Sequence, residues 1–140
     1  MEECVIIDFV RTPFSRSRPG KAEKDVFHKL RADDLAAMNI KEILKRTSVD
    51  ATEIDDCLIG CALQLDENWL DGGRITSLVA GLPFNVPAMG MDRQCASSLS
   101  TIQIGAMEIM TGMANNELVI AGGMEHMTRI PMNMIAKVPV

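Results

Sequence analysis

Four short apolar runs alternate with longer amphipathic or polar stretches along the chain, and this alternation constrains the fold more than any other feature. The runs occupy residues 4–10, 57–63, 85–92 and 117–123. They are rich in aliphatic residues and nearly free of charge, as strands buried on both faces are. The order predicts an α/β fold, with a mostly parallel sheet, helices on both faces and right-handed crossovers.

Three helices are predicted between these strands, over residues 31–47, 74–80 and 95–112. The first has acidic residues in its opening turn and basic residues in its closing turn, which suits the helix dipole. Its apolar face is formed by Leu35, Met38, Ile40, Ile43 and Leu44. A polar linker over residues 66–73 precedes the second helix. Ligands and catalytic groups in such folds gather at the carboxyl ends of the strands. We therefore expect them in the segments after Val10, Leu63, Asp92 and Gly123.

Composition excludes several classes of partner. The net charge is −5, and the chain has four Phe, one Trp and no Tyr, so it lacks both the dense basic surface and the aromatic platforms of nucleic-acid binders. Its longest charge-free stretch, residues 75–91, is interrupted by Pro83 and Pro87, which predicts no membrane span. Acidic residues near the start argue against a targeting segment, so we expect a cytoplasmic protein with reduced thiols.

Three of the four cysteines are predicted to be core residues. Cys4 lies inside the first expected strand, where it is a small buried hydrophobe. Cys57 and Cys61 share one face of the second strand about 13 Å apart, which is too far for a disulfide. They also lack the second ligand pair of a zinc site, and no metal is expected.

Cys95 differs from the others because it follows a strand and opens the longest predicted helix. The free N–H groups and the dipole of a helix N-terminus favour a thiolate, and Arg93 adds a positive charge nearby. The small residues after it leave room for a substrate, so Cys95 is a candidate nucleophile. The alternative is a packed cysteine, because it shares a helical stripe with Leu99, Ile102, Ala106 and Ile109.

Several motifs in register give the chain a resemblance to the N-terminal part of thiolases, which transfer acyl groups between coenzyme A (CoA) thioesters. They are RTPF at 11–14, RADDLAA at 31–37, DRQCASSL at 92–99 and AGGMEHMTRIPM at 121–132. The resemblance implies that Cys95 accepts the acyl group as a thioester and that its backbone N–H helps to bind the oxyanion. It also implies CoA and acyl-CoA as substrates, no tightly bound cofactor, an oligomeric assembly, and a place in fatty acid metabolism such as β-oxidation.

Two residues near the expected site need separate interpretation. Many thiolases have Asn where this chain has Asp92, whose negative charge would oppose a nearby thiolate. His126 follows the Gly-Gly turn, but the catalytic His of thiolases lies far downstream in a Gly-His-Pro motif. We therefore expect His126 to be structural.

Residues 1–140 would correspond to an incomplete thiolase N-terminal domain, without the loop domain and the C-terminal half. The resemblance therefore implies either a fragment or one subunit of a divided enzyme, inactive until a chain supplies the C-terminal half. Two alternatives remain. One is a non-catalytic interaction or acyl-CoA-binding module, and the other is a redox-responsive thiol protein that uses Cys95.

Overall fold

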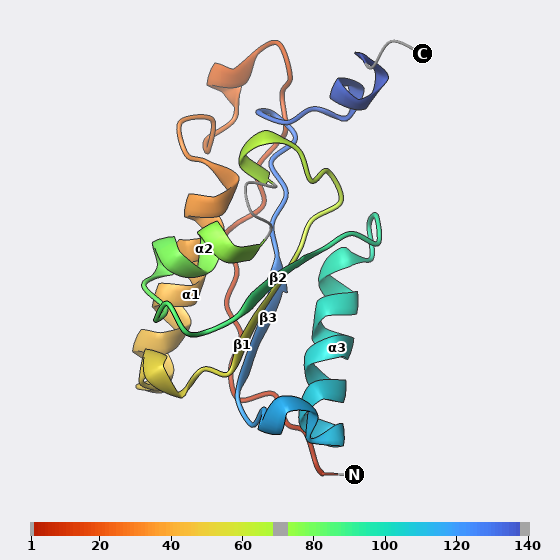
Figure 1. Ribbon diagram of the computed structural model, residues 1–140. Helices are drawn as coiled ribbons and strands as arrows, with labels where there is room; N and C mark the ends of the chain where they lie inside the picture. The colour runs from red at the N-terminus through yellow and green to blue at the C-terminus, as the bar shows by residue number, and fades with distance from the viewer. Residues whose placement is uncertain (1, 69–72, 138–140) are drawn as a thin grey trace.

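The computed structural model of the protein describes residues 2–68 and 73–137 (Figure 1). Residues 69–72, half of the predicted polar linker, lie outside the described residues, as does the end of the chain after residue 137. No helix in the described ranges is both long enough and apolar enough to cross a membrane.

The sheet has three parallel strands, β1 (Asp56–Gly60), β2 (Ala88–Met91) and β3 (Val119–Gly123). Their order is β2-β1-β3, so the earliest strand in sequence is central and β3 forms one edge. Leu58 pairs with Met89 on one side and with Ala121 on the other. The predicted parallel sheet is therefore confirmed for three of the four expected strands.

Helices cover both faces of this sheet, as the sequence predicts (Figure 1). α1 (Ala32–Thr47) and α2 (Gly73–Ala80) lie together on one face, and α3 (Ser97–Thr111) lies on the other. Asp33, Asp34, Lys45 and Arg46 occupy the first and last turns of α1 as expected. Short 3-10 turns lie at Ala22–Lys24, Ala51–Glu53, Asp66–Asn68, Met113–Asn115 and Met132–Lys137.

The main apolar core lies between the sheet and the helices α1 and α2. Its buried members come from α1, β1, α2 and the segments before β1 and β2: Ala37, Ile40, Ile54, Cys57, Ile59, Ala80, Leu82 and Val86. The predicted apolar face of α1 is partly wrong, because Met38 is exposed while Ala36 and Ala37 are buried in its place. Small side chains on this face let α1 pack closely against α2.

The first expected strand, residues 4–10, is a clear difference between prediction and structure. The segment is extended but forms no ladder, and its apolar side chains are largely exposed. Cys4 is half-buried rather than enclosed in a core. A β-branched run favours extended backbone, but a strand also needs a partner at hydrogen-bond distance. Here a cavity separates the segment from β3.

Candidate active site

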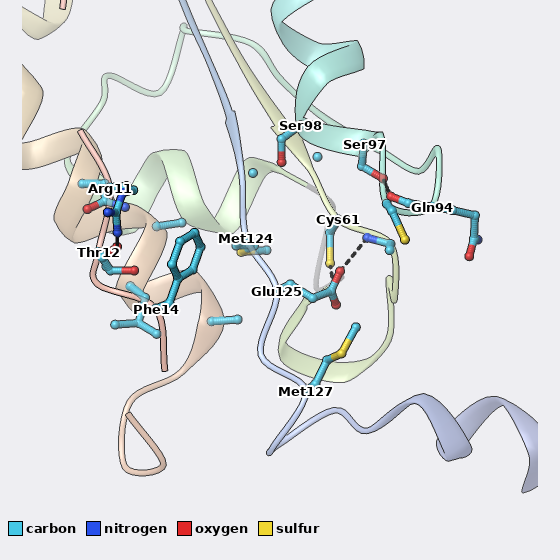
Figure 2. Close-up of a pocket in the computed structure, with 18 of the residues that line it drawn as sticks. Arg11, Thr12, Phe14, Cys61, Gln94, Ser97, Ser98, Met124, Glu125 and Met127 are labelled. Carbon is cyan, nitrogen blue, oxygen red and sulfur yellow. Dashed lines mark hydrogen bonds between the residues drawn. The ribbon is translucent and has the colours of Figure 1, made fainter. Parts of the chain in front are cut away.

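A cavity of about 470 Å³ lies at the carboxyl ends of β1 and β3, next to the start of α3. Figure 2 shows its walls, with Arg11 and Phe14 on one side, Gln94 and Ser97 on the other, and Cys61 and Glu125 between them. Cys95 is among the lining residues. The cavity therefore brings together the strand ends where the sequence analysis places the catalytic groups.

A tight turn carries the chain from β2 to Cys95. Gln94 has a φ of +51°, a left-handed conformation that costs a residue with a side chain roughly 1–3 kcal/mol. Two hydrogen bonds hold it there. The Gln94 N–H donates to Asp92 Oδ1 at 2.7 Å, and Ser97 Oγ donates to the Gln94 carbonyl at 2.6 Å. Asp92 therefore acts on the backbone of the turn.

Cys95 is solvent-exposed and precedes the first residue of α3 by two positions. The predicted helix over 95–112 thus begins later, at Ser97, with Ala96 as the residue before its first turn. The packed-cysteine alternative is not what the structure shows, since Leu99 and Ile102 of the same stripe are exposed as well. Arg93 turns its guanidinium to Ser100 Oγ, 3.2 Å away, so part of its hydrogen-bonding capacity is used on α3.

The start of α3 rests directly on the ends of two strands, and this contact fixes the position of the turn. A Cβ atom at Gly60 would lie 2.5 Å from the carbonyl carbon of Ser97. A Cβ atom at Gly123 would lie 2.5 Å from the Gly60 carbonyl oxygen. Thr101 Oγ1 also donates a hydrogen bond to the Gly122 carbonyl at 2.8 Å. Only glycine at these strand ends allows so close an approach.

Cys61 lines the same cavity but is buried. Burial, together with the charge of Glu125, raises the pKa of the Cys61 thiol to about 12. Its Sγ lies 3.6 Å from Glu125 Oε1, as the dashed lines of Figure 2 indicate. A thiol held in its protonated form is a poor nucleophile. Of the two cysteines that line the cavity, Cys95 is therefore the exposed one and Cys61 the unreactive one.

Glu125 is a site residue to which the sequence analysis assigns no role. Its carboxylate accepts hydrogen bonds from the Ala62 N–H at 2.9 Å and from Asn68 Nδ2 at 3.1 Å. It thereby ties the segment after β1 to the segment after β3. The sequence signal was its place just beyond Gly123, at the end of an expected strand.

The remaining sequence candidates lie outside this cavity. Cys57 is buried, and this burial, with the charge of Asp56, raises the pKa of its thiol to about 12. His126 is buried too, with Nε2 lying 3.2 Å from the Phe27 carbonyl oxygen. Its own carbonyl accepts hydrogen bonds from the N–H groups of Arg129 and Ile130. These contacts agree with the structural role expected for His126.

The described residues hold no cluster of three or more His, Cys, Asp or Glu side chains suited to a metal ion. All four cysteines are free thiols. The lining of the cavity brings the exposed Cys95 thiol together with hydroxyls and amides, the Arg11 side chain and the Glu125 carboxyl group.

Comparison with known proteins gives one consistent result. Residues 4–139 match the family model described as thiolase, N-terminal domain. The chain is 43% identical over 134 residues to a 3-ketoacyl-CoA thiolase of Yersinia enterocolitica, covering 95% of this chain and 33% of that protein. It is 42% identical over 132 residues to a β-ketoadipyl-CoA thiolase of Acinetobacter baylyi, covering 94% of this chain and 31% of that protein.

The chain thus spans about a third of the length of the curated relatives it matches. The family match covers nearly every residue and includes the turn around Cys95 and the segment after β3. It confirms the resemblance that the motifs indicate, and it agrees with the parallel sheet described above. The chain belongs to the thiolase family.

Proposed function

We propose that Cys95 is the nucleophile of a thiolase-type acyl transfer between CoA thioesters. The observation that carries the proposal is the exposed thiol on a strained turn, facing a cavity at the carboxyl ends of two parallel strands. Strain at an observed backbone outlier is common at functional sites, because it holds a reactive group away from the packed core. The small side chains of Ser97 and Ser98 leave room beside it.

The proposed half-reaction is a thioester exchange. The Cys95 thiol gives up its proton to solvent or a base, and its sulfur attacks the acyl carbon of the thioester. A bond forms between Cys95 Sγ and that carbon, while the bond from the carbon to the CoA sulfur breaks. CoA leaves as a thiolate and takes up a proton. With a 3-ketoacyl-CoA, the Cys95 sulfur attacks the 3-keto carbon instead of the thioester carbon. The bond from that carbon to C2 then breaks, and acetyl-CoA leaves as a carbanion that is then protonated.

The backbone at Cys95 supports oxyanion binding in this step. Among the described residues, no hydrogen bond is donated by the Cys95 N–H, whereas the N–H groups of Arg93, Gln94 and Ala96 are all engaged. A free N–H at the attacking residue is suited to stabilise the negative charge that develops on the thioester oxygen.

The relatives' names suggest 3-ketoacyl-CoA substrates. We propose that the chain takes part in their thiolysis or formation, in the cytoplasm and in a process such as β-oxidation. A full catalytic cycle also needs a general base and acid, which contribute typically about 10²–10⁴-fold. We propose that residues outside this chain supply them, within an oligomer or from a companion chain. The exposed apolar residues Leu99, Ile102 and Met107 on α3 support a larger assembly.

A CoA exchange assay tests the thioester-exchange half-reaction alone, apart from the carbon–carbon bond chemistry of the full cycle. The chain, combined with a companion chain that carries the C-terminal half of a thiolase, is incubated with acetyl-CoA and isotopically labelled free CoA, and labelled acetyl-CoA is measured over time. The proposal predicts exchange that is proportional to protein concentration and abolished in Cys95→Ser, since a serine hydroxyl is far less ionised at neutral pH.

Cys61→Ser is the matched control, because it removes the other thiol of the same cavity. It should retain exchange. A binding module would retain acetyl-CoA without any exchange. A redox-responsive thiol would instead show reversible oxidation of Cys95 under mild peroxide and no exchange. Either of these outcomes would contradict the proposed function.

A further inference from the structure

The Cys95 cavity is lined by two thiols, which follow neighbouring strands of the sheet. Cys61 comes directly after β1, and Cys95 comes after the turn that ends β2. Cys95 is exposed, whereas Cys61 is only 3% exposed. A thioester or any other electrophile that enters this cavity meets a wall with two sulfur atoms. Chemistry confined to Cys95 therefore requires that Cys61 be kept unreactive.

Glu125 is the charged residue in contact with Cys61. Its Oε1 lies 3.6 Å from Cys61 Sγ, and Figure 2 shows the two side chains facing each other. A carboxylate only accepts hydrogen bonds, so the thiol is the donor in this contact. A carboxylate is also a much weaker base than a thiolate, so the proton stays on the sulfur. Loss of that proton would place two negative charges side by side.

Further hydrogen bonds fix the Glu125 carboxylate in this position. Its Oε2 accepts from the Ala62 N–H at 2.9 Å, and its Oε1 also accepts from Asn68 Nδ2 at 3.1 Å. Asn68 is 1% exposed, and its Nδ2 donates to the Leu63 carbonyl oxygen as well, at 3.1 Å. The carboxylate therefore cannot turn away from Cys61 without breaking hydrogen bonds to the segment that follows β1.

The other groups around Cys61 mostly act in the same direction. Burial is the largest cause of the raised pKa of its thiol, and the charges of Glu125 and Asp92 add to it. The Leu63 N–H, which bonds to the sulfur, lowers this pKa. Arg11 also lines the cavity, but its guanidinium donates to a neighbouring backbone carbonyl at 2.9 Å. Glu125 is thus the charged contact that decides the state of Cys61.

We infer that Glu125 is a positioning residue that holds Cys61 as a hydrogen-bond donor and so confines the acyl chemistry of the cavity to Cys95. The acyl part of this inference rests on the proposed function, whereas the contact acts against any electrophile. Without the carboxylate, Cys61 loses its proton to solvent and its sulfur attacks the acyl carbon of a CoA thioester. A bond forms between Cys61 Sγ and that carbon, the bond from the carbon to the CoA sulfur breaks, and CoA takes up a proton.

Two variants separate the charge of Glu125 from its contacts. Glu125→Gln keeps the length of the side chain and an acceptor oxygen but removes the charge. Glu125→Asp keeps the charge but shortens the side chain. Glu117→Gln is the matched control, because Glu117 is exposed and precedes β3 at its opposite end. Each chain is combined with the thiolase C-terminal half and treated with iodoacetamide over a range of pH. Peptide mass spectrometry then gives the labelling rate of each cysteine.

Glu125→Gln should label Cys61 about tenfold faster than the wild type and shift the rise in labelling to lower pH, because one pKa unit changes the thiolate fraction tenfold. Glu125→Asp and Glu117→Gln should leave the rate within about threefold of the wild type. Equal Cys61 rates in Glu125→Gln and Glu117→Gln would overturn the inference. Faster labelling in Glu125→Asp than in Glu125→Gln would do so too, since contacts and not charge would then control Cys61.

An infrared measurement on the wild type needs no substitution of Glu125. The S–H stretching band of Cys61, identified by its loss in Cys61→Ser, should persist at a pH where the band of Cys95 has disappeared. Simultaneous loss of both bands would overturn the inference even if Glu125→Gln failed to fold. Slow labelling of Cys57, which is buried outside this cavity, reports that each variant remains folded.

Incubation with acetyl-CoA tests the acyl part. Glu125→Gln should carry acetyl groups on Cys61 and Cys95, and the wild type on Cys95 alone. Acetylation of Cys95 alone in Glu125→Gln would overturn the inference and leave the proposed function intact. A wild type without acetyl on Cys95 would instead contradict the proposed function, and the alkylation rates would still decide whether Glu125 controls Cys61.

Discussion

Cys95 is the exposed member of the four thiols, while Cys57 and Cys61 are buried with pKa values raised to about 12. At pH 8 a thiol with such a pKa is ionised in only about one molecule in 10⁴. Brief iodoacetamide treatment of the folded protein should therefore label Cys95 first, as read by peptide mass spectrometry. Faster labelling of Cys57 or Cys61 would contradict the assignment of Cys95 as the reactive thiol.

Asp92 holds the turn through one oxygen, which accepts from the Gln94 N–H. Asn offers the same acceptor without the charge that opposes a thiolate at Cys95. Asp92→Asn should thus keep the fold and raise the alkylation rate of Cys95 roughly two- to fivefold. Asp92→Ala removes the acceptor and serves as the comparison. Equal losses of rate in both variants would show that the carboxylate itself is required.

Glu108 is a buried carboxyl group on α3, held by a hydrogen bond from Asn116 Nδ2. Burial raises its pKa above the ordinary value of 4.5, an effect that outweighs the hydrogen bond. The folded state therefore binds this proton more tightly than the unfolded state, and the contribution of Glu108 to stability falls as pH rises above 4.5.

Glu108→Gln keeps a polar group near Asn116 and removes the titration. The variant should be more stable than the wild type at pH 7, and the difference should shrink as pH falls toward 4.5. Thermal unfolding of both proteins across this pH range measures it. A wild type that is the more stable protein at pH 7 would contradict the expected cost of burying the charge.

At the scale of elements, the contact between α3 and the strand ends positions the site. Gly60→Ala places a methyl group against the Ser97 backbone and should cost about 1–3 kcal/mol in the free energy of unfolding. Gly122→Ala is the matched control, since a Cβ atom there meets no atom within 4 Å. It should change stability by less than about 1 kcal/mol. Denaturant unfolding compares them, and equal stabilities would contradict the tight contact.

The elements also show how far sequence patterns reach. Helix bounds in α1 and α2 agreed to within a residue, because their dipole charges and glycine stop are local signals. The strand at residues 4–10 was wrong, because strand formation depends on a partner edge that no local pattern reports. The left-handed conformation of Gln94 was missed for a similar reason. It is imposed by Asp92 and Ser97, and Gln itself does not favour it.

At the scale of the whole molecule, the sheet order places the chemistry. Because all three strands are parallel, their carboxyl ends meet at one edge of the sheet. The turn after β2, the Glu125 segment after β3 and the Cys61 segment after β1 therefore converge on one cavity. That convergence was predictable from the alternation of elements, whereas the pairing of Glu125 with Ala62 and Asn68 needed the three-dimensional structure.

The central claim is that this cavity performs covalent acyl transfer through Cys95. The most direct measurement is to incubate the chain, combined with a thiolase C-terminal half, with excess acetyl-CoA. The reaction is then quenched at low pH, and the acetyl group is mapped by peptide mass spectrometry. We predict one acetyl group on the peptide that contains Cys95, removable by neutral hydroxylamine as a thioester should be, and absent in Cys95→Ser. An unmodified Cys95, or an acetyl group that persists elsewhere in Cys95→Ser, would contradict the claim.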